Sequence, residues 1–278
     1  MWDPDRYLVF ADQRGRPFAD LMAQVRATDP AEVVDLGCGP GNATVALARR
    51  WPRARVVGVD SSSEMIAAAR ELDGAEFVEA DLREWSPSGP VDVLVSNATL
   101  QWVPDHLDEL PRLASFVAPA GWFAFQVPGN FGEPAHVLLR GLLESPRWRD
   151  RLDVARPASR EPATYLDTLL GLGFEADVWE TTYLHVLPGD DAVLAWMSGT
   201  GLRPVLDALD GDERDEFVGE YRTRLRAAYP PRRHGTVLPY RRIFAVGRRP
   251  DTTPSRADAG AARPDARPSR PARDGSAG

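Results

Sequence analysis

Residues 33–42 read Val-Val-Asp-Leu-Gly-Cys-Gly-Pro-Gly-Asn, a short apolar run followed by three closely spaced glycines. This order predicts a buried β-strand that turns sharply into a helix beginning near Ala43. Glycine adopts backbone conformations closed to other residues and, having no Cβ, lets a ligand lie against the main chain. The dinucleotide-binding fingerprint needs a third glycine at position 42, where this chain has Asn42. The turn therefore predicts a cofactor site and disfavours an NAD-dependent oxidoreductase.

Short apolar runs alternate with helical patterns through the first half of the chain. The predicted strands are residues 33–36, 56–59, 76–78, 91–96 and 122–127, and the predicted helices are residues 43–50, 64–72 and 107–116. Nearly uniformly apolar strands separated by helices indicate a parallel sheet that is covered on both faces. We therefore predict an α/β fold with a doubly wound, Rossmann-like sheet.

The alternation ends near Gly129, and four domain segments follow from this. Helical patterns cover 134–143, 163–172, 190–197 and 211–228, and strand patterns cover 178–187 and 237–246. We expect the two late strands to pair antiparallel at one sheet edge, and the extra helices to form a lid over the carboxyl ends of the strands. The predicted segments are a lid segment at 1–20, a cofactor-binding core at 21–128, lid insertions with the last strands at 129–249, and a disordered tail at 250–278, whose composition cannot bury enough surface to order it.

Composition and charge exclude several classes of protein. The net charge of −8 argues against a nucleic-acid-binding protein, which needs a basic surface. The sequence has no apolar run of about 18 residues, so no membrane span is expected. A single cysteine, Cys38, and four scattered histidines make a metal site improbable. We expect a cytoplasmic protein that acts on a small molecule; the sequence leaves its oligomeric state open, a monomer included.

The second predicted strand ends in Asp60, 19 residues beyond Gly41. A carboxylate at this place can accept hydrogen bonds from both hydroxyls of a ribose. The alternative is that Asp60 caps the helix that begins near Ser63. Asp35, in the first strand, likewise either belongs to the cofactor site or caps the glycine turn.

The glycine spacing after an acidic residue resembles the first motif of class I methyltransferases. Several other segments together resemble the trans-aconitate 2-methyltransferase family, and the similarity covers roughly residues 1–249. These segments are Trp2-Asp3-Pro4 with Tyr7, Phe10, Arg14 and Pro17, residues 96–102 (Ser-Asn-Ala-Thr-Leu-Gln-Trp), residues 196–204 with Gly-Thr-Gly-Leu-Arg-Pro at 199–204, Tyr229-Pro230-Pro231, and Arg241-Arg242-Ile243-Phe244.

The resemblance implies methyl transfer from S-adenosylmethionine to a carboxylate of trans-aconitate, which gives a monomethyl ester. A carboxylic acid is already ionised at neutral pH, so the reaction needs no general base. Anionic oxygen and cationic sulfonium lose charge as they react, so excluding water and aligning the two groups should favour the reaction. The implied cofactor-binding residues are Asp35, Gly37, Gly39, Gly41, Asp60, Ser61, Met65, Asp81, Leu82 and Asn97.

On the acceptor side, we expect positioning residues after the fourth strand and arginines that hold the other carboxylates, because guanidinium groups pair well with carboxylates. The expected positioning residues are Gln101, Trp102 and His106, and the expected substrate-binding residues are Arg203, Tyr240, Arg241 and Tyr7, with Arg242 a further candidate beside Arg241. Each arginine is alternatively a solvated surface charge, Trp102 a core residue, and His106 an exposed or capping residue. The alternative functions are methylation of another small carboxylic acid or of a secondary metabolite, and a catalytically silent cofactor-binding regulator.

Overall fold

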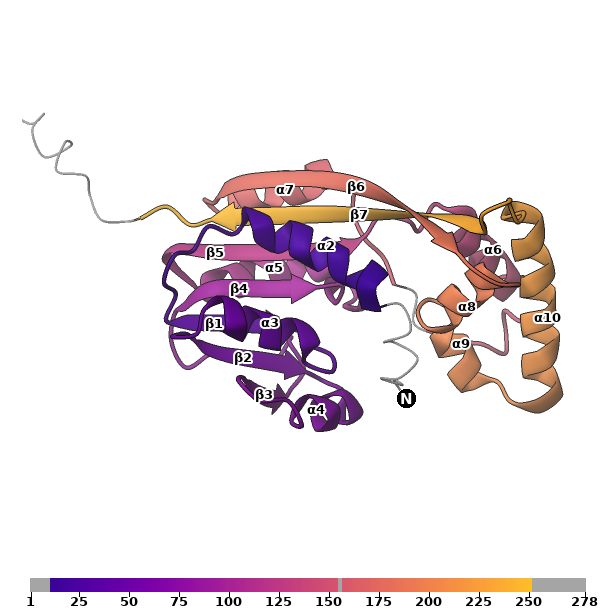
Figure 1. The fold of residues 1–278 in the computed structure, drawn as a ribbon, viewed down its shortest axis with the longest axis horizontal. Coiled ribbons are helices and arrows are strands. Elements are labelled where there is room, and N and C mark those ends of the chain that lie inside the picture. Colours follow the sequence, from indigo (N-terminus) through magenta and orange to yellow (C-terminus); the bar gives the residue numbers. More distant parts are fainter. Residues whose placement is uncertain (1–10, 155–156, 252–278) are drawn as a thin grey trace, which may run out of the picture.

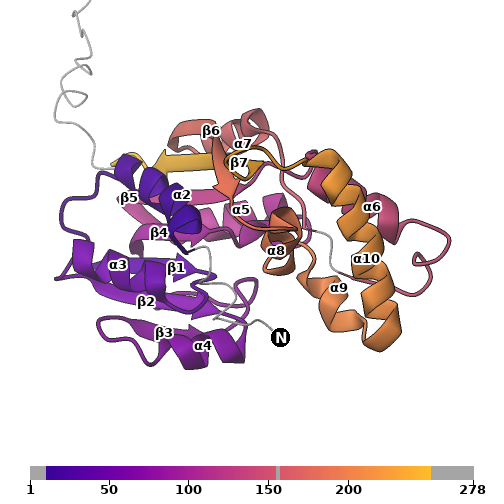
Figure 2. The same ribbon diagram turned by 45° about the vertical axis from the view of Figure 1, so that its right-hand side comes forward.

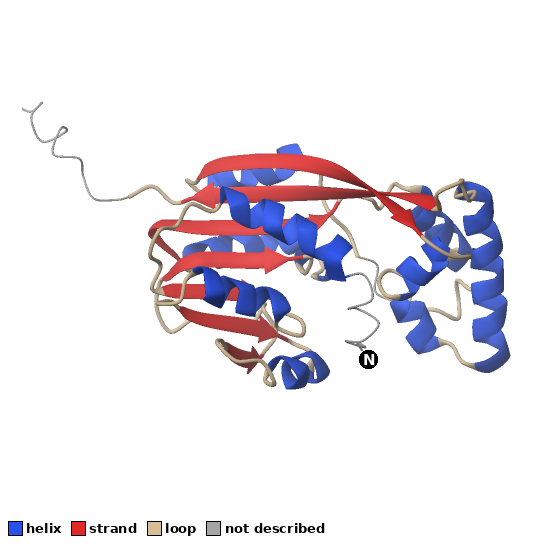
Figure 3. Cartoon of the chain, in the orientation of Figure 1, coloured by secondary structure: helices blue, strands red, loops and turns tan. Residues whose placement is uncertain are grey.

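A mixed β-sheet forms the centre of the computed structural model, which describes residues 11–154 and 157–251 (Figures 1 and 3). Within these residues the sheet has seven strands in the order β3-β2-β1-β4-β5-β7-β6. The strands are β1 (Glu32–Leu36), β2 (Arg55–Asp60), β3 (Glu76–Glu79), β4 (Val91–Asn97), β5 (Val117–Pro128), β6 (Glu175–Leu187) and β7 (Thr236–Arg248). Because β1 is central and the order runs outward from it in both directions, the sheet is doubly wound, as predicted.

Strands β1 to β5 are parallel, and the last two strands form the predicted antiparallel pair at one edge. Strand β7 lies between β5 and β6 and runs antiparallel to both. The expected mostly parallel sheet with an antiparallel edge is therefore confirmed, and the reversed strand is β7. Its pairing with β5 runs from Trp122 opposite Arg248 to Pro128 opposite Arg242. The first part of β7, residues 236–241, pairs with β6 alone.

Helices cover both faces of the sheet because successive strand residues point to opposite sides. Val33, for example, packs into the core on the face of α2 and α3, whereas Val34 packs into the core on the face of α5 and α7. The helices are α2 (Ala11–Gln24), α3 (Asn42–Arg50), α4 (Ser63–Ala69), η1 (Leu100–Trp102), α5 (His106–Ser115), α6 (Pro134–Leu143), α7 (Pro162–Gly171), α8 (Ala192–Ser198), α9 (Arg203–Ala208) and α10 (Gly211–Ala228).

Helices α6, α8, α9 and α10 form a separate layer beyond the carboxyl ends of the parallel strands (Figures 1 and 2). The ends of β6 and β7 that extend past β5 reach this layer. Its apolar residues, such as Leu139, Trp196 and Tyr221, belong to the same buried cluster as Val33 of the sheet. The layer is therefore anchored to the sheet and stands over the edge at which ligands of α/β folds bind.

Two details differ from the sequence-based expectation. The predicted boundary between residues 20 and 21 falls inside helix α2, which packs against β5 and β7, so it is not a structural boundary. Helix α9 begins at Arg203, inside a segment that was not predicted to be helical. The predicted tail lies outside the described residues from 252 onward. No helix in the described part of the chain is long and apolar enough to span a bilayer.

Candidate active site

The glycine turn after β1 needs two of its glycines for different reasons. Gly37 and Gly39 both have positive φ angles, of 74° and 55°. A Cβ on Gly37 would stand 2.0 Å from Oγ1 of Thr99, whereas a Cβ on Gly39 would meet nothing within 4 Å. Gly37 therefore allows the turn to pack against Thr99, and Gly39 leaves open space in front of the main chain.

Asp60 connects the end of β2 to this turn. Its Oδ2 accepts a 2.9 Å hydrogen bond from the amide of Gly39, and its Oδ1 accepts one of 2.9 Å from the amide of Ser62. The helix-capping alternative for Asp60 is wrong, because the hydroxyl of Ser62 caps α4 by accepting from the amide of Met65. Asp60 instead lies at the wall of a cavity.

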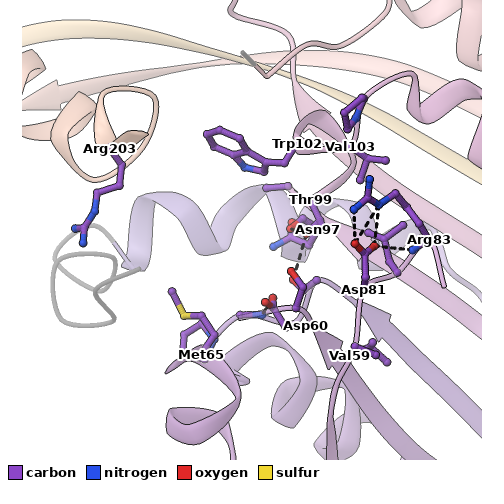
Figure 4. Close-up of a pocket in the computed structure, with 18 of the residues that line it drawn as sticks. Val59, Asp60, Met65, Asp81, Arg83, Asn97, Thr99, Trp102, Val103 and Arg203 are labelled. Carbon is purple, nitrogen blue, oxygen red and sulfur yellow. Dashed lines mark hydrogen bonds and ion pairs between the residues drawn. The ribbon is translucent and has the colours of Figure 1, made fainter. Parts of the chain in front are cut away.

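This cavity, the larger of two that adjoin each other, has a volume of about 650 Å³ and opens between the strand ends and helix α9 (Figure 4). Eight of the ten predicted cofactor residues line it: Gly37, Gly39, Asp60, Ser61, Met65, Asp81, Leu82 and Asn97. Figure 4 shows Asp60 and Met65 on one wall, Trp102 on the facing wall, and Arg203 across the cavity from Asp81. The cavity is thus built from the ends of four parallel strands, as the sequence pattern predicted.

The carboxylate of Asp81 is held by its neighbour Arg83. The Arg83 Nε donates to both carboxylate oxygens at 3.0 Å, and the backbone amide of Arg83 donates to Oδ1 at 2.9 Å. These hydrogen bonds lower the pKa of Asp81. Leu82, next in the chain, has its carbonyl bound by Arg112 of α5, which also donates to the carbonyl of Trp85 at 2.9 Å. The loop that lines this end of the cavity is therefore held from two sides.

Asp35 and Gly41, the other two predicted cofactor residues, do not line the cavity. Gly41 precedes helix α3 with a φ of 84°. Asp35 is 1% exposed; its Oδ2 accepts a 2.7 Å hydrogen bond from the hydroxyl of Thr44, and its Oδ1 has no hydrogen-bond partner among the described residues. Burial, with a smaller contribution from the negative charge of Asp60, raises the pKa of Asp35 to about 6. Asp35 thus lies behind the glycine turn as a partly unsatisfied buried carboxyl.

A second, smaller pocket of about 90 Å³ adjoins the first. Asn97, Ala98 and Trp102 line both spaces, so the cavity and the pocket meet at these three residues. Ala98 has a φ of 58°, an unfavourable conformation for a residue with a Cβ. The other residues that line the smaller pocket are Gln101, Gln126, Pro128, Asn130, Phe131, His136, Pro157, Trp196, Thr200, Gly201, Tyr240 and Arg242. The predicted residues Gln101, Trp102 and Tyr240 are thereby brought together.

Arg242 supplies the charge of the smaller pocket. It is 6% exposed, its Nη2 donates to the hydroxyl of Tyr240, and its guanidinium lies 4.2 Å from the centre of the Tyr240 ring. Its Nε and Nη1 have no hydrogen-bond partner within the described part of the chain. A buried cation with unused donors is costly unless an anion joins it, so this arrangement fits a carboxylate ligand.

Arg241 was predicted to bind the substrate, but it lines neither of the two pockets. Neighbouring residues of a strand point to opposite faces, and Arg241 points away from the pocket that holds Arg242. Its guanidinium pairs with Glu161 at 2.8 Å and with Glu180, and donates to the carbonyl of Gly129 at 3.0 Å. These groups raise its pKa. Arg241 therefore holds α7, β6 and the loop after β5 together and lines neither pocket.

His106 and Arg203 were predicted to lie beside the acceptor, but neither lines the smaller pocket. His106 is buried outside both pockets, and its Nε2 lies 2.8 Å from the hydroxyl of Tyr165, so its predicted place beside the acceptor is wrong. Arg203 lines the larger cavity rather than the smaller pocket, and its Nε donates to Asp207 at 3.1 Å. Tyr7 lies outside the described residues.

Four polar residues of the smaller pocket were absent from the predicted set: Gln126, Asn130, His136 and Thr200. Side-chain alternation could have separated Arg242 from its neighbour Arg241, because residues two apart in a strand share a face and Tyr240 was already predicted. Gln126 interrupts the apolar run of β5, and a buried polar residue in such a run is itself a signal. His136 and Asn130 carry no pattern in the sequence that marks them.

Comparisons with known proteins agree with this geometry. A family model described as a methyltransferase domain matches residues 10–170. A trans-aconitate 2-methyltransferase of Streptomyces coelicolor is 55% identical, with 90% of this chain and 87% of the relative covered. The chain belongs to the trans-aconitate 2-methyltransferase family. Further relatives of that name, from Streptomyces avermitilis and Rhodococcus jostii, are 54% and 50% identical, each covering 88% of this chain and 96% and 98% of the relatives.

Solved structures show that the fold is shared far beyond the trans-aconitate 2-methyltransferase family. The YcgJ protein of Bacillus subtilis superposes with a TM-score of 0.55 at 13% identity, covering 85% of this chain and 99% of that one. A phosphoethanolamine N-methyltransferase 2 of Haemonchus contortus, solved with S-adenosylhomocysteine, gives 0.51 at 15% identity, covering 84% of this chain and 52% of that one. At these identities the likeness concerns the class I methyltransferase fold alone.

Proposed function

We propose that the protein transfers a methyl group from S-adenosylmethionine to one carboxylate of trans-aconitate and releases the monomethyl ester. The observation that carries this proposal is that a cavity in front of an open glycine turn joins a pocket with a buried arginine at Asn97, Ala98 and Trp102. A cationic methyl donor and an anionic acceptor can therefore meet at that junction. The relatives that carry this activity in their names are 44–55% identical over most of their length.

The residues of the larger cavity fit S-adenosylmethionine. The open space before Gly39 admits a ligand against the main chain, and Asp60 presents the carboxylate suited to a ribose. Asp81 and Leu82 would border the adenine, and Met65 and Ser61 would border the nucleoside. When bound, the cofactor supplies an electrophilic methyl group on a sulfonium. The buried carboxylate of Asp35 adds negative charge behind the turn, and this favours a cation in front of it.

The residues of the smaller pocket bind and orient the acceptor. Nε and Nη1 of Arg242 can each donate a charge-assisted hydrogen bond to a carboxylate oxygen, and the hydrogen bond of Nη2 to Tyr240 holds the guanidinium in place. Gln126 is fixed in turn, because its Nε2 donates to Oδ1 of Asn97 at the junction. Trp102 and Trp196 enclose the pocket with apolar surface, which excludes water from groups that lose charge as they react. No proton need be removed from an ionised carboxylate.

Two measurements test the proposal. S-adenosylhomocysteine should raise the melting temperature of the purified protein, whereas NAD should leave it unchanged, because ligand that binds only the native state stabilises it. Transfer of labelled methyl groups should then be compared across di- and tricarboxylic acids and neutral acceptors. Preferential methylation of trans-aconitate supports the proposal. If monocarboxylic or neutral acceptors react far better, the proposed acceptor is wrong while methyl transfer stands.

A further inference from the structure

His136 occupies the acceptor pocket together with Arg242, yet the reaction described above does not use it. It lies on the first turn of α6, its ring packs edge-on against Phe131 with centroids 5.0 Å apart, and it lines the pocket beside Gly201. A methyl group placed on Gly201 would stand 3.2 Å from Cε1 and 3.5 Å from Nδ1 of this imidazole. Apolar and glycine neighbours thus fix the ring at the pocket wall.

The ring nitrogens of His136 have no hydrogen-bond partner among the described residues, and the side chain is only partly buried. A polar ring that is held in place by Phe131 but has unused nitrogens can still bind a ligand. The pocket that His136 lines is the one where we place the acceptor. Its nitrogens are therefore available to an acceptor carboxylate.

Burial and two positive charges disfavour a proton on the ring of His136. Burial has the largest effect, and Arg140, one turn along α6, and Arg242, from β7, repel the proton, so that the pKa of His136 falls to about 4. Of the described residues that line this pocket, Arg242 alone carries a permanent charge, and Tyr240 is the other titratable group. At neutral pH the pocket consequently offers one positive charge to a polycarboxylate.

We propose that His136 is a second acceptor-binding residue, which takes up a proton when the acceptor enters and binds one of its carboxylates as an imidazolium. The proposal rests on the proposed function, because a polyanionic acceptor provides the driving force. An anion beside the ring attracts the proton and neutralises Arg242, which had repelled it. A proton moves from solvent to the imidazole, and no covalent bond to the acceptor forms. Acceptors with fewer carboxylates gain less from this residue.

Proton uptake on binding has a definite pH signature. Between the pKa of the free ring, about 4, and the higher pKa of the occupied ring, acceptor affinity should increase as pH falls, by up to about tenfold per pH unit. Above the higher pKa the ring stays neutral and affinity should no longer depend on pH through this residue. The useful window is about pH 5.5–7.5, where an acceptor carboxylic acid with a pKa near 4 remains mostly ionised.

Calorimetry tests the proposal directly. Trans-aconitate is titrated at pH 6 into the full-length protein saturated with S-adenosylhomocysteine, in several buffers that differ in ionisation enthalpy. The wild type should take up a large fraction of one proton per acceptor bound, and the uptake should decline toward zero by about pH 9. His136→Gln, which keeps a hydrogen-bonding group but cannot become charged, should abolish the uptake and weaken binding about tenfold at pH 6. His234→Gln, on an exposed turn, is the matched control and should bind with the wild-type uptake.

The outcomes separate this proposal from the proposed function. Binding of trans-aconitate by the wild type without proton uptake, or with an uptake that His136→Gln retains, overturns the role of His136 and leaves the function intact. Failure of trans-aconitate to bind or to be methylated overturns both. S-adenosylhomocysteine affinity reports whether His136→Gln is folded, and the wild-type measurement decides the question without any variant. In steady-state assays the variant should raise KM with little change in kcat, most strongly at low pH.

Discussion

The carboxylate of Asp60 accepts a 2.9 Å hydrogen bond from the amide of Gly39, so the acid at the end of β2 fixes the main chain of the glycine turn. The same carboxylate binds the amide of Ser62 through its other oxygen. Asp60 thus lies at the meeting point of the turn and of the loop before α4. Its position makes it both part of the cavity wall and a support for it.

Asp60→Ala should therefore reduce affinity for S-adenosylmethionine by about 100-fold or more, because the ribose hydrogen bonds that we propose for this carboxylate and the restraint on Gly39 would be lost together. Titration with S-adenosylhomocysteine by calorimetry measures this. Asp73→Ala, which removes an exposed carboxylate from the loop before β3, is the control and should bind normally. Unchanged affinity in Asp60→Ala would show that the nucleoside binds elsewhere.

The two glycines of the turn should respond differently to the same substitution. Gly39→Ala adds a methyl group to open space, so the protein should fold with a loss of about 1 kcal/mol from its positive φ but bind cofactor weakly. Gly37→Ala drives a methyl group into Thr99, so it should lose far more stability. Chemical denaturation and cofactor titration of both variants check this. Equal stability losses would show that the turn relaxes in a way the structure does not indicate.

Arg242 and Arg241 form a natural pair of test and control. Arg242→Gln should raise the KM for the acceptor by about 100-fold and spare cofactor affinity, because a buried positive charge with unused donors for a carboxylate is lost. Arg241→Gln should leave KM nearly unchanged and lower the free energy of unfolding by about 1 kcal/mol or less, since its ion pairs with Glu161 and Glu180 are largely exposed. Steady-state kinetics with both substrates varied decides between them. The reverse pattern would place the acceptor on the other face of β7.

Most residues that the sequence analysis assigned to the cofactor site lie around one cavity, because their positions depend on local patterns. The glycine spacing places Gly37 and Gly39 in one turn, and the parallel strands bring Asp60, Asp81 and Asn97 to one sheet edge. Each position follows from where a strand ends. Periodicity places these residues at one edge, the family resemblance implied the roles of Asp81 and Asn97, and the comparisons with methyltransferases agree with the resulting fold.

The acceptor side depends on features that no local pattern determines. Arg241 and Arg242 point to opposite faces of β7. Which of the two enters the pocket therefore depends on which face of the strand is turned toward it, and a shift of one residue would exchange them. His136 and Asn130 come from the segment after β5, and only the docking of the helical layer brings them to Trp196 and Gln101. His106 follows the fourth strand closely in sequence, yet its side chain contacts Tyr165 and lies outside the pocket.

Asp35 gives a prediction that links stability with function. Burial raises its pKa in the folded protein to about 6, above the usual value of 3.8 for an aspartate, so its ionisation opposes folding. The destabilisation is fully present above about pH 7 and disappears as pH falls through 6 toward 4. Asp35→Asn can still accept the hydrogen bond from Thr44 and carries no charge. It should be more stable than the wild type at pH 8, by at most about 3 kcal/mol, with the difference vanishing near pH 4.

Urea denaturation of both proteins at pH 8, 6 and 4.5 measures this dependence, and Asp73→Asn, an exposed carboxylate, should show none of it. A stability difference that is the same at all three values would mean that the ionisation of Asp35 does not oppose folding. We further expect Asp35→Asn to bind S-adenosylmethionine more weakly, because the negative charge behind the glycine turn is lost. The uncharged thioether of S-adenosylhomocysteine should be affected less. A buried charge that destabilises the free protein would then be retained because it attracts the sulfonium of the cofactor.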